Sequence, residues 1–375
     1  MTFLEKLRRY TSMLAPRPKC SNLPPGFSGQ TALGCNSIPA RILICRPNHR
    51  LGNLLLITPI VQEVSNIFPK CRIDLFVKGK VAGSLFKNYE NVENIIQLPK
   101  RPFQHILSYI NGWIQIRKNR YDIAVNVDQS SSSGRLSVLF ANSRSKILGS
   151  VIDELRKKYA DYDHHAKFPV YNLWKHLGLI RLYEGENRMP PVDLKLEASE
   201  IAEGQKILRD LVRNENLTIC LFTFATGQKC YSQQWWVHFY EKLRAEFPHV
   251  NIIEILPLHK VSGLSSRIAS FYSTDIREIG SVIANCALFI GADSGIMHLA
   301  SSVKTPTVGL FSVTDQTRYA PYQNNSTAFN TNSGDFNKCL KAISFILNAG
   351  QVMKRRERRQ LSIPLKYLGD QLLLS

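Results

Sequence analysis

The sequence lacks the paired cysteines that usually hold a structural metal ion. Its 375 residues include eight cysteines, but these are scattered and no two form a Cys-x-x-Cys pair. Cys45, Cys220 and Cys286 fall inside apolar runs, where a thiol behaves as a small buried hydrophobic group. This spacing argues against a zinc site and suits a reducing cytoplasm. We therefore expect neither a metal nor a cofactor.

Long apolar runs and an export signal are also missing. No run approaches the roughly 20 residues that a membrane-spanning helix needs, and the first residues lack the apolar stretch and cleavage site of a secretory signal. Residues 1–18 instead predict a short amphipathic helix, with Thr2 and Glu5 as a capping box. Two interpretations of this segment stay open: packing on the protein or a disordered tail, and contact with a membrane surface.

Acidic residues are few compared with basic ones: 29 Asp and Glu against 48 Lys and Arg give a formal net charge of +19. The basic residues cluster at 117–118, 156–158 and 354–359. Such a field attracts nucleic acid, anionic lipid headgroups or a phosphorylated acceptor. No nucleic-acid-binding motif accompanies the charge, so we expect no nucleic-acid partner.

Short β-rich runs alternate with helical stretches from residue 41, and the pattern restarts after a Pro-containing loop near residue 190. This alternation predicts two α/β units with parallel sheets, and ligands of such units often bind where the strands end. The predicted divisions are a basic N-terminal extension (1–40), a first domain (41–195), a second domain (196–345) and a basic helical tail (346–375). The expected strands span 40–47, 72–79, 92–99, 121–128, 217–225, 250–257, 287–292 and 305–312.

One corner of the second unit contains residues that could bind an anionic ligand. The apolar run ending at Ala292 is followed by Asp293, Ser294 and Gly295, and then by the helical stretch "IMHLASSV". The first N–H groups of a helix lack internal partners and attract phosphate or pyrophosphate. His298 lies one turn further along the same helix face. The alternative is purely structural, with Asp293 or Ser294 capping the helix and His298 buried as an interior residue.

The Walker lysine motif and Gly-x-Gly-x-x-Gly are absent, so this corner belongs to neither of those phosphate-binding types. The stretch "ADSGIMHLASSVKTPTVGLF" resembles instead the signature of the heptosyltransferase family of glycosyltransferases. The segments "RLGNLLLITPIVQEVSNIFP" and "TFATGQKCYSQQWWVHFYEKL" match two more of its regions in the expected order. The resemblance covers residues 41–345. It implies the GT-B fold, an α/β architecture of two Rossmann-like domains with parallel sheets facing across a cleft.

The family's members move a sugar, usually heptose from ADP-heptose, onto the lipopolysaccharide inner core, with inversion and without a required metal. By resemblance, Asp293 would bind hydroxyls of the donor sugar. Ser294, Gly295 and His298 would surround the donor pyrophosphate. Thr223 and Thr226 lie in a loop that also contacts donor phosphate in the family.

The sequence departs from the family at its catalytic base. Where the family reads Leu-Gly-Asp, this chain has Asn53, and an amide does not accept a proton near neutral pH. Three readings stay open: His49 on the same loop supplies the base, a carboxylate elsewhere such as Asp128 does, or the acceptor is weakly activated or not turned over.

The sequence also departs from the family in the region that is expected to contact the nucleotide. The family often has a lysine two residues before a helix-opening Trp; if Trp235 is that residue, Gln233 takes the lysine's place, and Lys229 is the candidate substitute. Leu258 and His259 stand where many members hold the ribose with an acidic residue. Trp235 and Trp236 are expected to pack their helix onto the sheet rather than to stack on a base.

We therefore expect a bacterial cytoplasmic glycosyltransferase, peripheral on the inner face of the inner membrane. Its expected partners are a nucleotide-sugar donor such as ADP-heptose and an anionic glycolipid acceptor, with Arg50 contacting acceptor acid groups. The alternative is a non-catalytic nucleotide-sugar-binding protein that has lost its base, and Asn53 is the residue that favours it.

Overall fold

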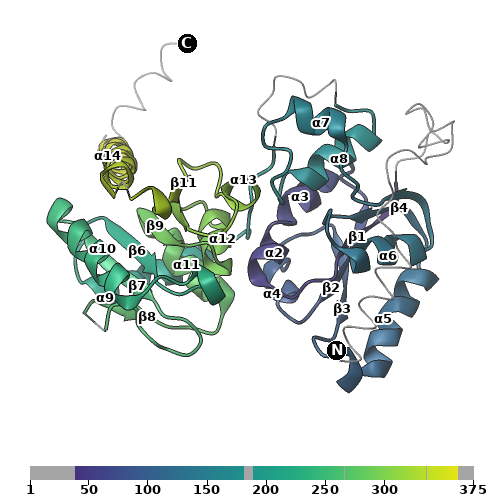
Figure 1. The fold of residues 1–375 in the computed structure, drawn as a ribbon, viewed down its shortest axis with the longest axis horizontal. Coiled ribbons are helices and arrows are strands. Elements are labelled where there is room, and N and C mark those ends of the chain that lie inside the picture. Colours follow the sequence, from purple (N-terminus) through teal and green to yellow (C-terminus); the bar gives the residue numbers. More distant parts are fainter. Residues whose placement is uncertain (1–38, 181–188, 266, 335, 362–375) are drawn as a thin grey trace, which may run out of the picture. The chain divides into compact units, whose positions relative to one another are not determined.

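The computed structural model describes residues 39–180, 189–265, 267–334 and 336–361, in two compact units (Figure 1). Unit 1 comprises Met1–Glu197 together with Asp315–Ala320, and unit 2 comprises Ala198–Thr314 together with Pro321–Ser375. The helix predicted for residues 1–18 lies outside the described residues. Among the helices that are described, none has the length and apolar character to cross a bilayer.

Unit 1 is built on a parallel five-stranded sheet of order β3-β2-β1-β4-β5. The central strand is fully buried from Ile42 to Cys45, because helices cover both faces of the sheet. Figure 1 shows α2, α3 and α4 on one side of the sheet and α5 and α6 on the other. The strands are β1 (Arg41–Arg46), β2 (Arg72–Lys78), β3 (Val92–Leu98), β4 (Tyr121–Asn126) and β5 (Ser143–Ile147).

The helices of unit 1 connect these strands. The helical pattern of "NLLLITPIVQEVSNIFP" predicts one helix containing Pro59, and this prediction is wrong: the chain forms two helices, and Pro59 lies in the first turn of the second, where its missing N–H costs nothing. Residues 151–180 form two short helices joined by a loop. The helices are α2 (Leu51–Leu55), α3 (Thr58–Ile67), α4 (Ala82–Leu85), η1 (Pro102–Gln104), α5 (Ile106–Lys118), α6 (Ser132–Phe140), α7 (Asp153–Lys158), α8 (Phe168–His176) and α13 (Gln316–Tyr319).

Unit 2 is built on a parallel six-stranded sheet of order β11-β10-β9-β6-β7-β8. Its strands are β6 (Thr218–Phe222), β7 (Asn251–Ile255), β8 (Ser270–Phe271), β9 (Leu288–Ala292), β10 (Thr307–Phe311) and β11 (Thr327–Asn330). Its helices are α9 (Ala198–Val212), η2 (Gly227–Lys229), α10 (Gln233–Glu246), α11 (Ile276–Ala284), α12 (Gly295–Ser302), η3 (Thr331–Ser333) and α14 (Phe336–Leu361). The basic run at 354–359 belongs to α14.

The strand order determines where each unit can bind a ligand. In unit 1 the chain runs outward from β1 in one direction and then restarts at β4, and in unit 2 it restarts at β9 beside β6. At such a switch point the connections leave in opposite directions, which opens a crevice beyond the carboxyl ends of the two strands. The predicted α/β class with two parallel sheets is confirmed.

Candidate functional site

The corner after β9 lies at the switch point of unit 2, because β9 pairs with β6. Asp293 follows the strand directly, is 5% exposed, and donates its N–H to Leu310 O at 3.1 Å. Ser294 has an extended backbone and caps α12, with Oγ accepting the Met297 N–H at 3.3 Å. That bond leaves the earlier amides of Gly295 and Ile296 in the positions where a helix offers N–H groups to an anion.

Lys229 reaches the same corner from η2, 64 residues earlier in the chain. Its Nζ lies 2.5 Å from Asp293 Oδ2, and about a third of its side chain is exposed. The pair holds a cation next to the helix start while keeping the buried Asp293 carboxylate compensated. The structure therefore brings Lys229, Asp293, Ser294 and Gly295 together at this corner.

His298 lies inside this corner, 4% exposed, with Nε2 3.9 Å from Asp293 Oδ1. Burial lowers the pKa of His298 to about 4; the Lys229 ammonium also lowers it, and the Asp293 carboxylate opposes both. The imidazole is therefore neutral near pH 7. A neutral imidazole would not add positive charge next to a bound diphosphate.

Thr223 and Thr226 differ in what they can touch. Thr223 is buried and donates its hydroxyl to Glu254 Oε1 at 2.6 Å, so its hydroxyl hydrogen is already engaged within unit 2. Glu254 is fully buried at the end of β7 and also accepts the Gly263 N–H at 2.9 Å and the Ser262 hydroxyl. Thr226 is exposed at the start of η2 and remains a candidate.

Glu254 was not singled out in the sequence, although an acidic residue inside the apolar run "NIIEI" was the available signal. Gln233, in the place of the family's lysine, donates to Ser265 Oγ at 2.6 Å. It thus ties the start of α10 to the loop after β7. His259 on that loop packs edge-on against Phe224, with ring centroids 4.6 Å apart.

Trp235 and Trp236 pack, as expected. Trp236 is 1% exposed in the core of unit 2, and Trp235 stacks on Tyr231 and Phe239 with centroids 4.3 and 5.2 Å away. Both rings therefore fix α10 to the sheet.

The loop after β1 contains the predicted base and acceptor residues of unit 1. His49 and Arg50 are exposed, and Asn53 lies half-buried on α2. Partial burial lowers the pKa of His49, and the nearby charges of Lys100, Lys78 and Arg50 lower it further. His49 is therefore neutral and able to accept a proton at neutral pH.

Asp128, the other candidate base, is committed elsewhere. Its carboxylate pairs with Arg46 and accepts bonds from the Ser130 N–H and hydroxyl at 2.9 and 2.8 Å. Burial alone would raise the pKa of Asp128, but Arg46, Ser130 and His165 outweigh it and the pKa is lowered. A carboxylate stabilised in this way is a weak proton acceptor.

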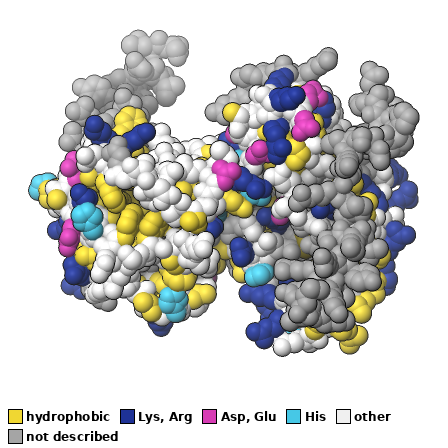
Figure 2. Space-filling model, in the orientation of Figure 1, with side chains coloured by type: hydrophobic (Ala, Val, Ile, Leu, Met, Phe, Trp, Pro, Cys, Tyr) yellow, Lys and Arg dark blue, Asp and Glu magenta, His cyan; other side chains and the backbone are white. Residues whose placement is uncertain are grey.

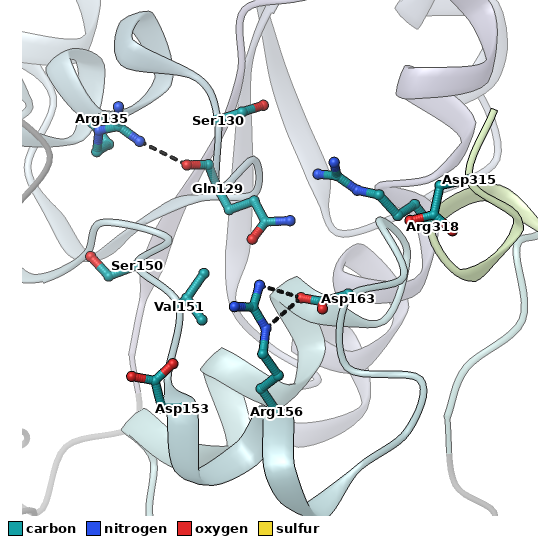
Figure 3. Close-up of a pocket in the computed structure, with 10 residues that line it drawn as sticks. All are labelled: Gln129, Ser130, Arg135, Ser150, Val151, Asp153, Arg156, Asp163, Asp315 and Arg318. Atoms are coloured by element: carbon teal, nitrogen blue, oxygen red, sulfur yellow. Dashed lines mark hydrogen bonds and ion pairs between the residues drawn. The ribbon is translucent and has the colours of Figure 1, made fainter. Parts of the chain in front are cut away.

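A pocket of about 510 Å³ in unit 1 has several arginines in its wall (Figure 3). Arg135 donates to Gln129 O at 2.9 Å, and Arg156 pairs with Asp163. In the part of the chain that the structure describes, Nε of Arg135 and Nε of Arg318 are buried without a hydrogen-bond partner. The lining residues are Gln129, Ser130, Arg135, Ser150, Val151, Asp153, Arg156, Asp163, Asp315 and Arg318.

The guanidinium groups of Arg135, Arg156 and Arg318 give the wall of this pocket a positive charge that suits an anion. No pattern in the sequence predicts this pocket. Arg135 and Arg318 are 183 positions apart in the sequence, and no local pattern joins them. The described residues hold no group of three or more His, Cys, Asp or Glu side chains placed to share a metal ion.

Comparison with known proteins gives a consistent result. Residues 271–345 match the family model described as glycosyltransferase family 9 (heptosyltransferase). The chain is 22% identical over 310 residues to lipopolysaccharide heptosyltransferase 3 of Escherichia coli, covering 74% of this chain and 85% of the relative. It is 21% identical to lipopolysaccharide heptosyltransferase 1 of Campylobacter coli, covering 72% and 83%.

Two solved structures share the fold. The ADP-heptose lipopolysaccharide heptosyltransferase II of E. coli has a TM-score of 0.63 at 14% identity, covering 83% of this chain and 99% of that one. The family 9 glycosyltransferase of Veillonella parvula has a TM-score of 0.62 at 15% identity, covering 80% and 89%.

These matches first define a class: the chain is a glycosyltransferase with the GT-B fold. Within that class the similarity is to the heptosyltransferases of glycosyltransferase family 9, so the resemblance carried by the corner motif is confirmed.

Proposed function

We propose that this protein transfers a heptose from ADP-heptose, with inversion, to an acidic sugar of a lipopolysaccharide inner core. The observation that carries the proposal is the corner in which Lys229 pairs with Asp293 beside the Ser294-capped start of α12. The similarity to heptosyltransferases supports heptose, and the E. coli enzyme WaaC, at 14% identity and a TM-score of 0.55, has been solved with ADP.

In the proposed reaction the acceptor hydroxyl oxygen bonds to the anomeric carbon as the bond from that carbon to the diphosphate oxygen breaks. ADP leaves, and its diphosphate gains negative charge in the transition state. The first amides of α12 and the Lys229 ammonium would stabilise this charge, because they are already oriented before the reaction begins. Asp293 would accept hydrogen bonds from the donor sugar.

The hydroxyl proton needs an acceptor, and we propose His49 for this role. His49 is exposed on the loop after β1 and neutral, whereas Asp128 is engaged by Arg46. Asn53 would orient a hydroxyl through its amide without taking the proton.

The pocket with arginines in its wall is the proposed acceptor-side anion site. A phosphate or carboxylate on the acceptor would accept hydrogen bonds from the guanidinium groups of the arginines that line it, Arg135, Arg156 and Arg318. Arg50, exposed near the end of β1, would add a further contact with acidic groups. Because such acceptors carry lipid, we place the protein at the inner face of the inner membrane.

ADP release tests the proposal. Wild-type protein should release ADP from ADP-heptose when an acidic inner-core glycolipid is present, and Lys229→Met should lower kcat/KM by roughly 100-fold. Lys206→Met, which removes an exposed lysine from α9, is the matched control and should keep the wild-type rate. If wild-type protein shows no affinity for ADP-heptose, the proposal is wrong.

A second candidate function is nucleotide-sugar binding without turnover, which Asn53 favours. Thermal stabilisation by ADP-heptose, combined with no ADP release at any acceptor concentration, would select it.

A further inference from the structure

Helix α5 exposes an apolar stripe that the described residues of its own unit do not cover. The stripe begins just before the helix and continues for two turns, and its members follow helical spacing along one side. They are Phe103 (51% exposed), Ile106 (51%), Leu107 (83%), Ile110 (49%) and Ile114 (41%). We call these five residues the α5 surface.

The opposite side of α5 already has its partners. Ile116 is fully buried, Trp113 meets the Phe76 ring with centroids 5.4 Å apart, and Tyr109 packs against the same cluster. Gly112 lies so close to β3 that a Cβ at this position would be 2.8 Å from Leu98 Cδ2. One face of the helix is therefore packed against the sheet, and the α5 surface is a separate, exposed face of the same helix.

Exposed apolar side chains continue onto the neighbouring helix. Leu139 and Phe140 at the end of α6 are 47% and 42% exposed. Phe140 meets Trp113 with ring centroids 5.7 Å apart, and the Arg117 guanidinium lies 5.9 Å from the Phe140 centroid. The apolar area is thus wider than one helix and has a cation at its edge.

The charged side chains in the sequence of and around α5 have one sign. Between Glu93 and Asp122 the sequence has no acidic residue, and the stretch contains five basic ones: Lys100, Arg101, Arg117, Lys118 and Arg120. They stand at the two ends of α5, with Lys100 and Arg101 before it and the others at or after its last turn. Figure 2 shows yellow and dark-blue side chains next to each other along the edge of unit 1 where α5 lies.

We propose that the α5 surface docks on a lipid bilayer with anionic headgroups. Large apolar side chains would enter the level of the acyl-chain boundary, and the basic residues at both ends of the helix would lie among the lipid phosphates. A nucleic acid would bind the basic residues but would leave the five large apolar side chains of the α5 surface without an apolar partner. A second copy of the chain would bring two sets of cations together, which repel each other.

The biological setting of this inference rests on the proposed lipid-linked acceptor, but its test uses neither donor nor acceptor. Full-length protein is sedimented with vesicles of phosphatidylcholine, either alone or with about 30% phosphatidylglycerol. We expect binding to the anionic vesicles that weakens as salt is added, and much less binding to the neutral ones.

The decisive variant is Leu107→Gln combined with Ile110→Gln, which keeps helix-forming residues on an exposed face. We expect its partition onto anionic vesicles to fall about tenfold. Ile201→Gln, at an exposed apolar position on α9, is the matched control and should bind as the wild type does. Far-UV circular dichroism and ADP-heptose binding should be unchanged in both variants, which separates this result from failure of the proposed enzyme function.

Three outcomes would overturn the inference. The first is that the α5 variant binds vesicles as tightly as the wild type does. The second is that Leu4→Gln with Leu7→Gln abolishes binding while the α5 variant has no effect, which would assign the membrane contact to the N-terminal segment alone. The third is that the wild-type protein is a dimer in light scattering and the α5 variant is a monomer, which would assign the surface to a second copy.

Discussion

At the scale of single residues, Asn53 is the departure from the family with the largest chemical consequence. If His49 takes the acceptor proton, His49→Ala should lower kcat by about 100-fold or more without changing donor affinity. Because the pKa of His49 is lowered, the wild-type rate should already be close to its plateau at pH 7 and should fall on the acid side of the ordinary histidine value. A kcat–pH profile measures this.

His249→Ala, at an exposed position of unit 2, is the control for that experiment. Full activity of His49→Ala would exclude His49 and favour a carboxylate elsewhere, and the activity of Asp128→Asn would show whether that carboxylate is Asp128.

The lowered pKa of the buried His298 leads to a separate prediction about stability. Its folded pKa of about 4 lies below the ordinary 6.5, so between these values the unfolded chain binds a proton that the folded chain does not. The free energy of unfolding should therefore fall as the pH drops from 6.5 towards 4, by on the order of 3 kcal/mol from this group. Urea unfolding at several pH values should show a smaller fall for His298→Gln than for wild type.

His238→Gln, on the exposed side of α10, should keep the wild-type pH dependence. Equal slopes for wild type and His298→Gln would mean that the imidazole is not held neutral.

Some of these residues were predictable and others were not. Asp293, Ser294 and His298 lie within six positions, so a local motif identifies them. The contact of Lys229 with Asp293 and the pairing of Arg46 with Asp128 depend on which strands become neighbours. The resemblance made Lys229 a candidate donor-binding residue, but only the fold shows that it pairs with Asp293.

At the scale of elements, the packing of α9 on α11 depends on a glycine. A Cβ at Gly204 would lie 2.3 Å from the Ser281 backbone, and the two helices would have to separate. Gly204→Ala should therefore lower the free energy of unfolding by about 2 kcal/mol, although alanine is the better helix former. Denaturant midpoints measure the change.

Gly83→Ala on α4 is the matched control, since its Cβ would meet no atom within 4 Å. We expect it to be neutral or slightly stabilising. A neutral Gly204→Ala would show that α9 shifts without loss.

The long buried strands were predicted from the sequence, because an apolar run bounded by turn residues has few other solutions in an α/β chain. The edge strands β5, β8 and β11 were missed. "SRSKI" alternates weakly, and β8 has only two residues, so neither has a hydrophobic pattern of its own. Their place is fixed by pairing with β4 and β7.

At the scale of the whole molecule, the alternation of strand and helix patterns indicated two α/β units but not how the chain is shared between them. The expected division lay after residue 195, and the contacts divide the chain after Glu197. The return of Asp315–Ala320 to unit 1 had no signal in the sequence, because a four-residue helix between two loops resembles any other connection. Its role is visible only where Arg318 reaches the pocket wall.

That returning segment also governs how the protein can be taken apart. The polypeptide passes from one unit to the other three times, at Glu197, Thr314 and Ala320. Within unit 1, the carbonyl of Arg318 receives the His165 N–H at 3.0 Å, and His164 bonds to Ala320 O at 2.9 Å. After a single protease cut near residue 197, these hydrogen bonds would therefore still hold the two fragments together. A gene fragment ending there would encode unit 1 without Arg318, one of the arginines that line its pocket.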